Sequence, residues 1–202
     1  MKKKEAENIT FKQFKTSIID DYKIAVTSRQ ASLIGRKEVL TGKAKFGIFG
    51  DGKELAQLAM ARVFRKGDYR SGYYRDQTFM MAKNLLTTES FFAQLYSNTN
   101  LDDEPSSAGR QMNSHFSTRM LDSNGNWRNV SKEFNSSADL SPTASQMPRL
   151  LGLAQASKIY KNYKINSSNF SNEGNEIAFG TIGNASTSEG LFFETVNAAG
   201  VL

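Results

Sequence analysis

Apolar residues recur at helical spacing near the start of the chain. Between Ile9 and Ile34 most charged side chains fall outside one apolar stripe of a helical wheel. The stripe consists of Phe11, Phe14, Ile18, Tyr22 and Ala25. Gly35 then offers a common helix stop. The pattern predicts a long N-terminal helix with one buried stripe, which packs on its own domain or on a partner subunit.

Helical periodicity returns in later segments. The predicted helices cover 53–64, 76–86, 90–96, 141–161 and 188–202. Thr88 or Ser90 is a candidate cap for the third of these. In the helix predicted for 53–64, the side chains expected to face inwards are Leu55, Leu58, Ala59 and Val63. In the helix predicted for 188–202, they are Phe192, Val196 and Ala199.

Two segments have strand character. The stretch from Tyr69 begins as a turn or short strand, and Glu176–Gly183 is a short apolar run typical of a buried strand. Helices that alternate with a buried strand indicate an α/β fold.

Periodicity fails between Ser97 and Leu140. A loop of this length inside a compact domain is usually functional or disordered. Arg110, Phe116 and Trp127 indicate that part of it docks on the protein.

Composition narrows the class of protein. The 202 residues, 39% hydrophobic and 23% charged, suit one sizeable globular domain. The absence of cysteine excludes disulfides, zinc fingers, iron–sulfur clusters and thiol nucleophiles. No apolar stretch is long enough to cross a bilayer, and "MKKKEAEN" lacks the apolar region of a secretory signal. We therefore expect a cytoplasmic protein without a membrane partner.

The net charge of +6 raises the question of nucleic-acid binding. Lys2, Lys3 and Lys4 supply half of that excess at one terminus, and the other basic residues are scattered among acids. We therefore expect no nucleic-acid partner.

The segment "FGTIGNASTSEG", Phe179–Gly190, joins the predicted strand to the last predicted helix. Small residues at a helix start can let unpaired N–H groups bind an anion such as phosphate. The oxygen of Asn184 suits Mg²⁺ or Ca²⁺. Alternatively, Ser186 or Ser188 simply caps the helix.

Two other features carry competing interpretations. "FGDGKE", Phe49–Glu54, resembles a metal-binding turn, but we interpret it as a turn with Asp51 capping the next helix. His115 is the single histidine, and in a polar loop it is either solvated or catalytic.

Four ordered motifs carry a family resemblance. "YYRDQTFMMA", "GRQMNSHF", "SPTASQMPRLLGLAQASK" and "GTIGNASTSEGLFFETVNAAG" resemble successive blocks of the alpha subunit of thiamine-diphosphate-dependent 2-oxo acid dehydrogenases, with the branched-chain (2-oxoisovalerate) type closest in wording. The resemblance runs from Gly42 to Leu202. It implies an N-terminal helical arm (1–41) and a thiamine-diphosphate-binding domain (42–202) with a parallel sheet flanked by helices. We expect the chain to stop short of that domain's C-terminal end.

The resemblance also implies roles for individual residues. Tyr74 and Arg75 match a pair that contacts the diphosphate, and His115 lies in a loop that approaches the reactive end of the cofactor. Ser141 and Thr143 match positions that line the cofactor pocket. Ser145 and Gln146, with the carbonyls of Leu140 and Pro142, match the ligands of a potassium site. Gly183, Asn184, Ala185 and Ser186 match the turn that binds the Mg²⁺-diphosphate. Asn184 replaces the usual metal-binding acid. Ser145 could instead cap the following helix.

By resemblance, the expected activity is oxidative decarboxylation of a branched-chain 2-oxo acid with acyl transfer to a lipoyl domain. The implied cofactors are thiamine diphosphate, Mg²⁺ and K⁺. The implied partners are a beta-type subunit or fused beta region, within a heterotetramer, and a lipoyl acyltransferase core. The chain alone should be inactive. A pyruvate or acetoin dehydrogenase subunit and a non-catalytic assembly module of the same fold stay open.

Overall fold

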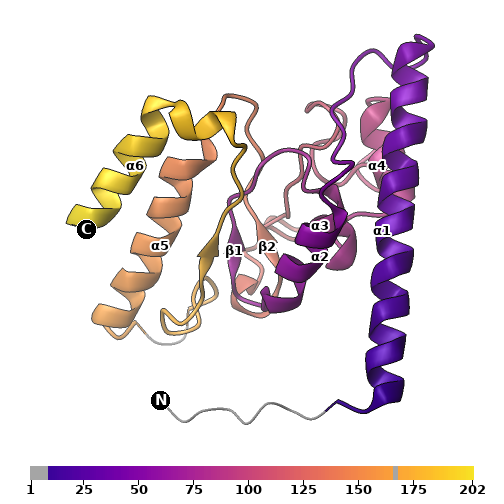
Figure 1. Cartoon of the computed structure of the whole chain (residues 1–202). Coiled ribbons are helices and arrows are strands. Elements are labelled where there is room, and N and C mark those ends of the chain that lie inside the picture. Colours follow the sequence, from indigo (N-terminus) through magenta and orange to yellow (C-terminus); the bar gives the residue numbers. More distant parts are fainter. Residues whose placement is uncertain (1–8, 166–167) are drawn as a thin grey trace.

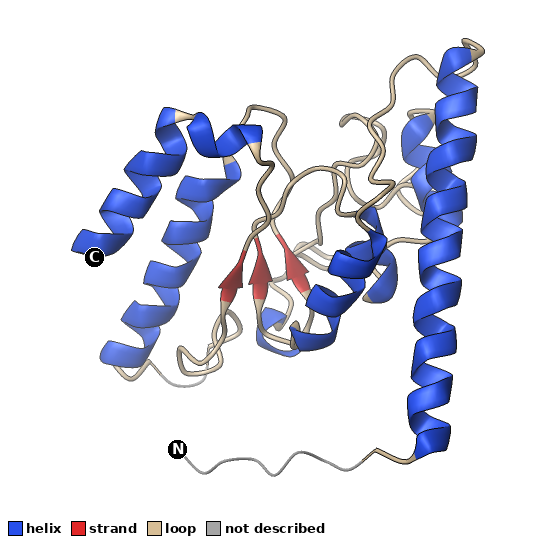
Figure 2. Ribbon diagram, viewed as in Figure 1, coloured by secondary structure: helices blue, strands red, loops and turns tan. Residues whose placement is uncertain are grey.

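The structure is a computed structural model that describes residues 9–165 and 168–202 (Figure 1). Helices flank a small central sheet on both sides, which confirms the expected α/β fold (Figure 2). The elements are α1 (Phe11–Leu40), α2 (Glu54–Val63), β1 (Tyr69–Arg70), α3 (Gln77–Ala82), α4 (Thr88–Leu95), η1 (Val130–Lys132), β2 (Asn135–Ser136), α5 (Gln146–Asn162), β3 (Ala178–Phe179), η2 (Ala185–Ser188) and α6 (Gly190–Val201).

Helix α1 is longer than its sequence pattern predicts. It begins with a capping box, in which Thr10 Oγ1 accepts the N–H of Gln13 at 3.3 Å and Gln13 Oε1 accepts the N–H of Thr10 at 2.8 Å. It continues through Gly35 to Leu40, so the predicted stop is wrong. The ring of Phe49 occupies the space that a side chain at position 35 would fill, so Gly35 allows close packing within the helix.

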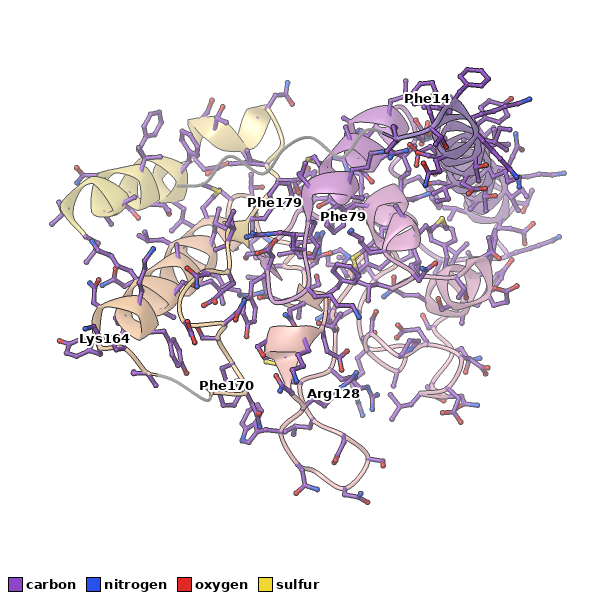
Figure 3. All side chains as sticks on the ribbon, turned by 90° about the horizontal axis from the view of Figure 1, so that it is seen from below. Phe14, Phe79, Arg128, Lys164, Phe170 and Phe179 are labelled. Carbon is purple, nitrogen blue, oxygen red and sulfur yellow. The ribbon has the colours of Figure 1, made fainter. Side chains whose placement is uncertain are left out.

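The apolar stripe predicted for α1 is not buried on its own domain, so of the two predicted options only packing on a partner subunit stays open. Only Ala25 of that stripe is half-buried, whereas Phe11, Phe14, Ile18 and Tyr22 are exposed, and Figure 3 shows Phe14 at the outer edge of the molecule. The helix instead meets the domain through Ser28, Ala31, Ser32 and Gly35. Small residues let the helix approach α3 closely, where the amide of Gln77 donates to Ser28 Oγ and Ser32 Oγ at 3.0 and 2.9 Å.

Other expected inward faces are displaced. On α2, Leu58 is buried, but Leu55, Ala59 and Val63 are exposed because the helix buries Glu54, Gln57, Leu58 and Ala61. On α6, Thr195 is the buried residue, Phe192 is half-buried, and Val196 and Ala199 are exposed.

Three capping assignments differ from expectation. Thr87, one residue before the first candidate, caps α4 and shares a capping box with Ser90. Asp51 is bound by Arg36 at 2.6 Å and does not cap α2, whose N-cap residue is Lys53. Ser186 and Ser188 lie within η2, and the N-cap residue of α6 is Glu189.

The sheet places the loops that matter for function. Strand β1 lies between β2 and β3, and both pairings are parallel, with Tyr69 opposite Asn135 and Ala178. The carboxyl ends of all three strands therefore open on one edge. Strand β2 was missed within the aperiodic stretch because its two residues are polar. Asn135 is nevertheless buried, and its amide donates to the carbonyls of Val130 and Glu133.

The main core lies between the sheet and helices α1 to α4 (Figure 1). Phe79 stacks on Phe179 with ring centroids 6.1 Å apart, and the two are neighbours in Figure 3. Phe116 from the long loop is buried, which confirms that part of this loop docks. Trp127 remains largely exposed, with its edge on Phe170, and Arg110 is exposed.

Candidate functional site at the carboxyl edge of the sheet

Three loops leave the sheet at the same edge and carry most of the candidate residues. The loop after β1 holds Tyr74 and Arg75, the loop after β2 leads to Ser141, and the turn after β3 holds Gly183 and Asn184. In open α/β sheets this edge is the usual place for a ligand. Residues more than a hundred positions apart in sequence thus come together.

Tyr73 joins the first loop to the last. Its hydroxyl accepts a hydrogen bond from Arg75 Nη2 at 2.6 Å. A Cβ atom at Gly183 would lie 3.1 Å from the same hydroxyl oxygen. The main-chain N–H of Tyr73 also donates to Thr181 Oγ1 at 2.9 Å. The guanidinium of Arg75 and the strand-to-helix turn are therefore neighbours.

Arg75 has an unusual backbone conformation and a confined side chain. Its φ of +91° lies in the left-handed region, which is costly for a residue with a side chain. Its guanidinium carbon lies 5.0 Å from the ring centroid of Tyr73 and 5.4 Å from that of Tyr74. Arg75 Nε is buried, and no residue in the described part of the chain accepts its proton. A buried donor without a partner is rare in folded proteins and calls for a specific explanation.

His115 is buried, which excludes the solvated interpretation of this residue. Its ring stacks on Tyr74 with centroids 5.3 Å apart and planes 8° apart. Nε2 lies 2.9 Å from Ser141 Oγ, and Nδ1 lies 3.2 Å from the carbonyl oxygen of Asn113. Arg75, Tyr74, His115 and Ser141 thus form one continuous row of contacts.

A buried ion cluster under this row escaped sequence reasoning. Arg70, 1% exposed, binds Asp76 Oδ2 at 2.8 Å and Asp139 Oδ1 at 2.9 Å. Burial alone would lower the pKa of Arg70, but the two carboxylates outweigh it and raise that pKa. For Asp139, burial raises the pKa of the carboxyl group, and the attraction of Arg70 offsets only part of that rise. The sequence offered no signal, since these residues are separated by loops and lack a recognisable spacing.

The ion cluster ties the loops together. Asp139 Oδ2 accepts the N–H of Phe116 at 3.0 Å, next to His115. Asp76 Oδ2 accepts the hydroxyl proton of Thr181 at 2.5 Å. Asp76 is bound to Arg70, whereas Arg75 donates to the hydroxyl of Tyr73. Arg70 therefore fixes the positions of all three strand ends.

The turn after β3 is open to solvent at its tip. Asn184 and Ala185 are exposed, while Ser186 is buried and its N–H donates to the carbonyl of Gly183 at 3.0 Å. Within the described residues no group of three histidine or acidic side chains forms a metal site. A metal at this turn would therefore rely on oxygens such as that of Asn184 together with those of a bound ligand.

Leu140, Pro142 and Ser145 lie in the turn that leads into α5, and Gln146 is the first residue of that helix. Gln146 is buried, and its Nε2 donates to the carbonyl of Thr181 at 2.9 Å. The N–H of Ser145 donates to the carbonyl of Pro142 at 3.2 Å. Ser145 is the N-cap residue of α5, but within residues 9–165 its side chain makes no capping hydrogen bond. Thr143, like Ser141, is exposed on the same turn.

These features define an α/β protein whose candidate site, at the carboxyl edge of a parallel sheet, brings together a guanidinium group, aromatic rings and hydroxyl groups. The sequence model of the dehydrogenase E1 component family matches residues 22–202. The chain belongs to this family, which confirms the resemblance found in its motifs.

A curated relative is the 2-oxoisovalerate dehydrogenase subunit alpha of Bacillus subtilis (strain 168), with 29% identity over 165 residues. The match covers 80% of this chain and 40% of that protein, so the chain spans well under half the length of this relative. In the described part of the chain, no helix is both long and apolar enough to span a membrane.

Proposed function

We propose that this chain is the alpha-type part of a 2-oxo acid dehydrogenase E1 component, which binds the magnesium diphosphate of thiamine diphosphate. The observation that carries the proposal is the meeting of Arg75 and the Gly183 turn at Tyr73, where Arg75 Nε is buried and finds no acceptor among the described residues. Guanidinium groups bind phosphate oxygens in a planar fork, and small residues at a turn permit close approach of a phosphate.

The residues fit this cofactor. Arg75 and Tyr74 would bind the diphosphate, with Gly183, Ala185 and Ser186 forming the turn around it, and the exposed Asn184 would ligate Mg²⁺. Ser141 and Thr143 would line the pocket. Bound thiamine diphosphate supplies the carbanion-stabilising chemistry of the reaction. The chain's own share is binding, orientation and proton handling, the last through His115.

We assign K⁺ to the turn before α5. The carbonyl oxygens of Leu140 and Pro142, with the side-chain oxygens of Ser145 and Gln146, would ligate it. The lack of a capping bond from Ser145 within residues 9–165 leaves its hydroxyl available for this role. Because Gln146 is hydrogen-bonded to the turn after β3, an ion here would stiffen the diphosphate site as well.

By analogy with the branched-chain relative, we propose a branched-chain 2-oxo acid as substrate and a lipoyl acyltransferase as acceptor. A beta-type subunit or region, in a heterotetramer, would complete the cytoplasmic enzyme, and the chain alone would be inactive. The exposed apolar residues of α1 favour such a subunit contact. Asn184 in place of an acid favours the competing proposal, a non-catalytic assembly module.

Calorimetric titration of the chain, alone and with its beta-type partner, with thiamine diphosphate and Mg²⁺ tests the proposal. We expect saturable binding that Arg75→Met weakens about 10- to 100-fold, because hydrogen bonds to charged groups contribute about 1.5–3 kcal/mol. Arg128→Met, which removes the partly exposed ion pair with Glu133, is the matched control and should leave binding unchanged. Absence of binding with the partner present would favour the assembly module. Turnover assays with branched-chain acids, pyruvate and acetoin then separate the substrate classes.

A further inference from the structure

Both polar groups of the Arg75 main chain are hydrogen-bonded to distant segments. The N–H of Arg75 donates to the carbonyl of Ser114 at 3.2 Å, and the carbonyl of Arg75 accepts a hydrogen bond from Gln57 Nε2 at 3.1 Å. Gln57 lies on α2 and is only 2% exposed, whereas Ser114 belongs to the loop that carries His115. Two distant segments thus hold one residue whose φ of +91° is costly for a residue with a side chain.

A third segment lies against the same carbonyl. A Cβ atom at Gly50 would overlap the carbonyl oxygen of Arg75, so that only glycine allows this close approach. The N–H of Gly50 donates to Gln77 Oε1 at 3.2 Å, which fixes the turn against the start of α3. The first glycine of "FGDGKE" is therefore needed for the position of Arg75.

The two partners of the Gln57 amide determine its orientation. Gln57 Oε1 accepts the N–H of Phe79 at 3.0 Å, so Nε2 is the part of the amide that donates to the Arg75 carbonyl. Phe79 lies in the first turn of α3, where N–H groups need partners from outside the helix. Among the described residues, the N-cap residue Asp76 makes no capping bond with its side chain, and its carboxylate binds Arg70. Gln57 thus holds the start of α3 and the residue before Asp76 with one amide.

We propose that Gln57 is a positioning residue for the guanidinium of Arg75. Its amide holds the Arg75 carbonyl in place, and the missing side chain of Gly50 makes room for that carbonyl. The side chain of Arg75 then reaches the hydroxyl of Tyr73, to which it donates at 2.6 Å. The inference deepens the proposed function and rests on it for the identity of the ligand, the diphosphate that Arg75 would bind.

A residue keeps a sparsely populated backbone conformation only where its surroundings over-determine it. Without Gln57 Nε2, the Arg75 carbonyl loses a donor, and the left-handed conformation becomes one of several accessible states. A ligand that needs the guanidinium in place then binds only a fraction of the molecules, and its apparent affinity falls by that fraction. Gln57 therefore acts on the ligand without touching it.

Solvent exchange of the Arg75 Nε–H tests the positioning without any ligand. This proton is buried in the chain, so nitrogen-15 NMR should show it protected, with Arg75→Lys identifying its resonance. Gln57→Met and Gly50→Ala act on the same carbonyl from two segments. Each should raise the exchange rate about 2- to 10-fold, the factor that one neutral hydrogen bond typically represents.

The control for a general loss of stability is Leu86→Ala. Leu86 is buried in the core beyond the opposite end of α3, so this variant creates a cavity away from Arg75. It should leave the exchange rate of the Arg75 Nε–H unchanged. An unprotected proton in the wild-type chain, or equal rates in the wild type and the folded variants, overturns the proposal. If Gln57→Met does not fold, Gly50→Ala decides the test.

Calorimetry on the chain with its beta-type partner tests the consequence for the cofactor. Gln57→Met and Gly50→Ala should each weaken binding of thiamine diphosphate with Mg²⁺ about 2- to 10-fold, whereas Leu86→Ala should not. The double variant of Arg75→Met and Gln57→Met should bind no more weakly than Arg75→Met alone, because a positioning residue acts only through the residue that it positions.

The outcomes separate the two proposals. Wild-type affinity in Gln57→Met and Gly50→Ala, or an additive loss in the double variant, overturns the positioning role and leaves the proposed function intact. A wild-type assembly that does not bind the cofactor overturns the proposed function, whereas proton exchange still decides whether Gln57 holds Arg75.

Discussion

The carboxylate of Asp139 lies 2.9 Å from Nη1 of Arg70, and both side chains are buried beneath the candidate site. One guanidinium thereby serves two carboxylates, since Asp76 binds its other side. Each acid also accepts a hydrogen bond from another loop, so the pair has a positional role beyond its charge.

Replacing Arg70 with Met should destabilise the chain strongly. The change leaves two buried carboxylates without their cation, and broken buried ion pairs typically cost about 3–5 kcal/mol. Urea unfolding followed by circular dichroism measures the loss. Arg128→Met, which breaks the exposed pair with Glu133, should cost less than about 1 kcal/mol. Equal losses in the two variants would refute the special position of Arg70.

A methyl group at position 72 should be poorly tolerated. A Cβ there would overlap the guanidinium of Arg70, which has no free space in which to move. We expect Gly72→Ala to lose about 1–3 kcal/mol in the free energy of unfolding. Gly152→Ala in α5 is the matched control, since its Cβ meets no atom within 4 Å, and it should gain about 0.5–1 kcal/mol. A neutral Gly72→Ala would show that the guanidinium is less tightly confined than its contacts indicate.

Removing the hydroxyl of Tyr73 should weaken cofactor binding without unfolding the protein. Tyr73→Phe deletes the 2.6 Å hydrogen bond from Arg75. Because the hydroxyl acts by orienting Arg75, we expect weaker binding of thiamine diphosphate with Mg²⁺, with a loss smaller than the about 10- to 100-fold expected for Arg75→Met. Calorimetry measures the affinity, and Tyr163→Phe on the exposed end of α5 is the control. Unaltered affinity would remove Tyr73 from the site.

Glu54 should give stability that disappears in acid. The hydrogen bond from Arg29 is the main cause that lowers the pKa of Glu54 to about 2, against an ordinary value of 4.5. A folded-state pKa below the unfolded one stabilises the protein above pH 4.5, and this contribution is lost as the pH falls towards about 2.

The comparison of wild type with Glu54→Gln isolates this effect. Arg29 is half exposed, so solvent screening limits the expected difference to about 1 kcal/mol at neutral pH. Urea midpoints measured in steps from neutral to acidic pH should converge for the two proteins below pH 4.5. If the stability difference between the two proteins persists at low pH, it arises from packing and not from the charge of Glu54.

The sequence predicted some parts of this molecule far better than others. Helix existence followed from periodicity, and the ordered motifs placed Tyr74, Arg75, His115 and the Gly183 turn at one site. Periodicity could not show that Phe11 and Tyr22 face outwards, because an apolar stripe looks the same whether it covers a core or a partner.

The features that the sequence did not predict depend on polar contacts between residues far apart in the chain. Strand β2 was hidden because Asn135 satisfies its amide through loop carbonyls, a property that local sequence does not encode. Arg70 and Asp139 are 69 positions apart, so only the parallel pairing of β1 with β2 brings them together. Tyr73 was overlooked because its neighbour Tyr74 carried the motif.

Strand β1 pairs with each neighbouring strand through only two residues, so the main-chain hydrogen bonds of the sheet are few. Alignment of the strand ends depends instead on the buried Arg70, which binds Asp76 and Asp139 and through them holds the loops that follow the strands. This arrangement concentrates sensitivity to mutation in one side chain of the central strand. Loss of this arginine would therefore release candidate site residues from distant parts of the chain together.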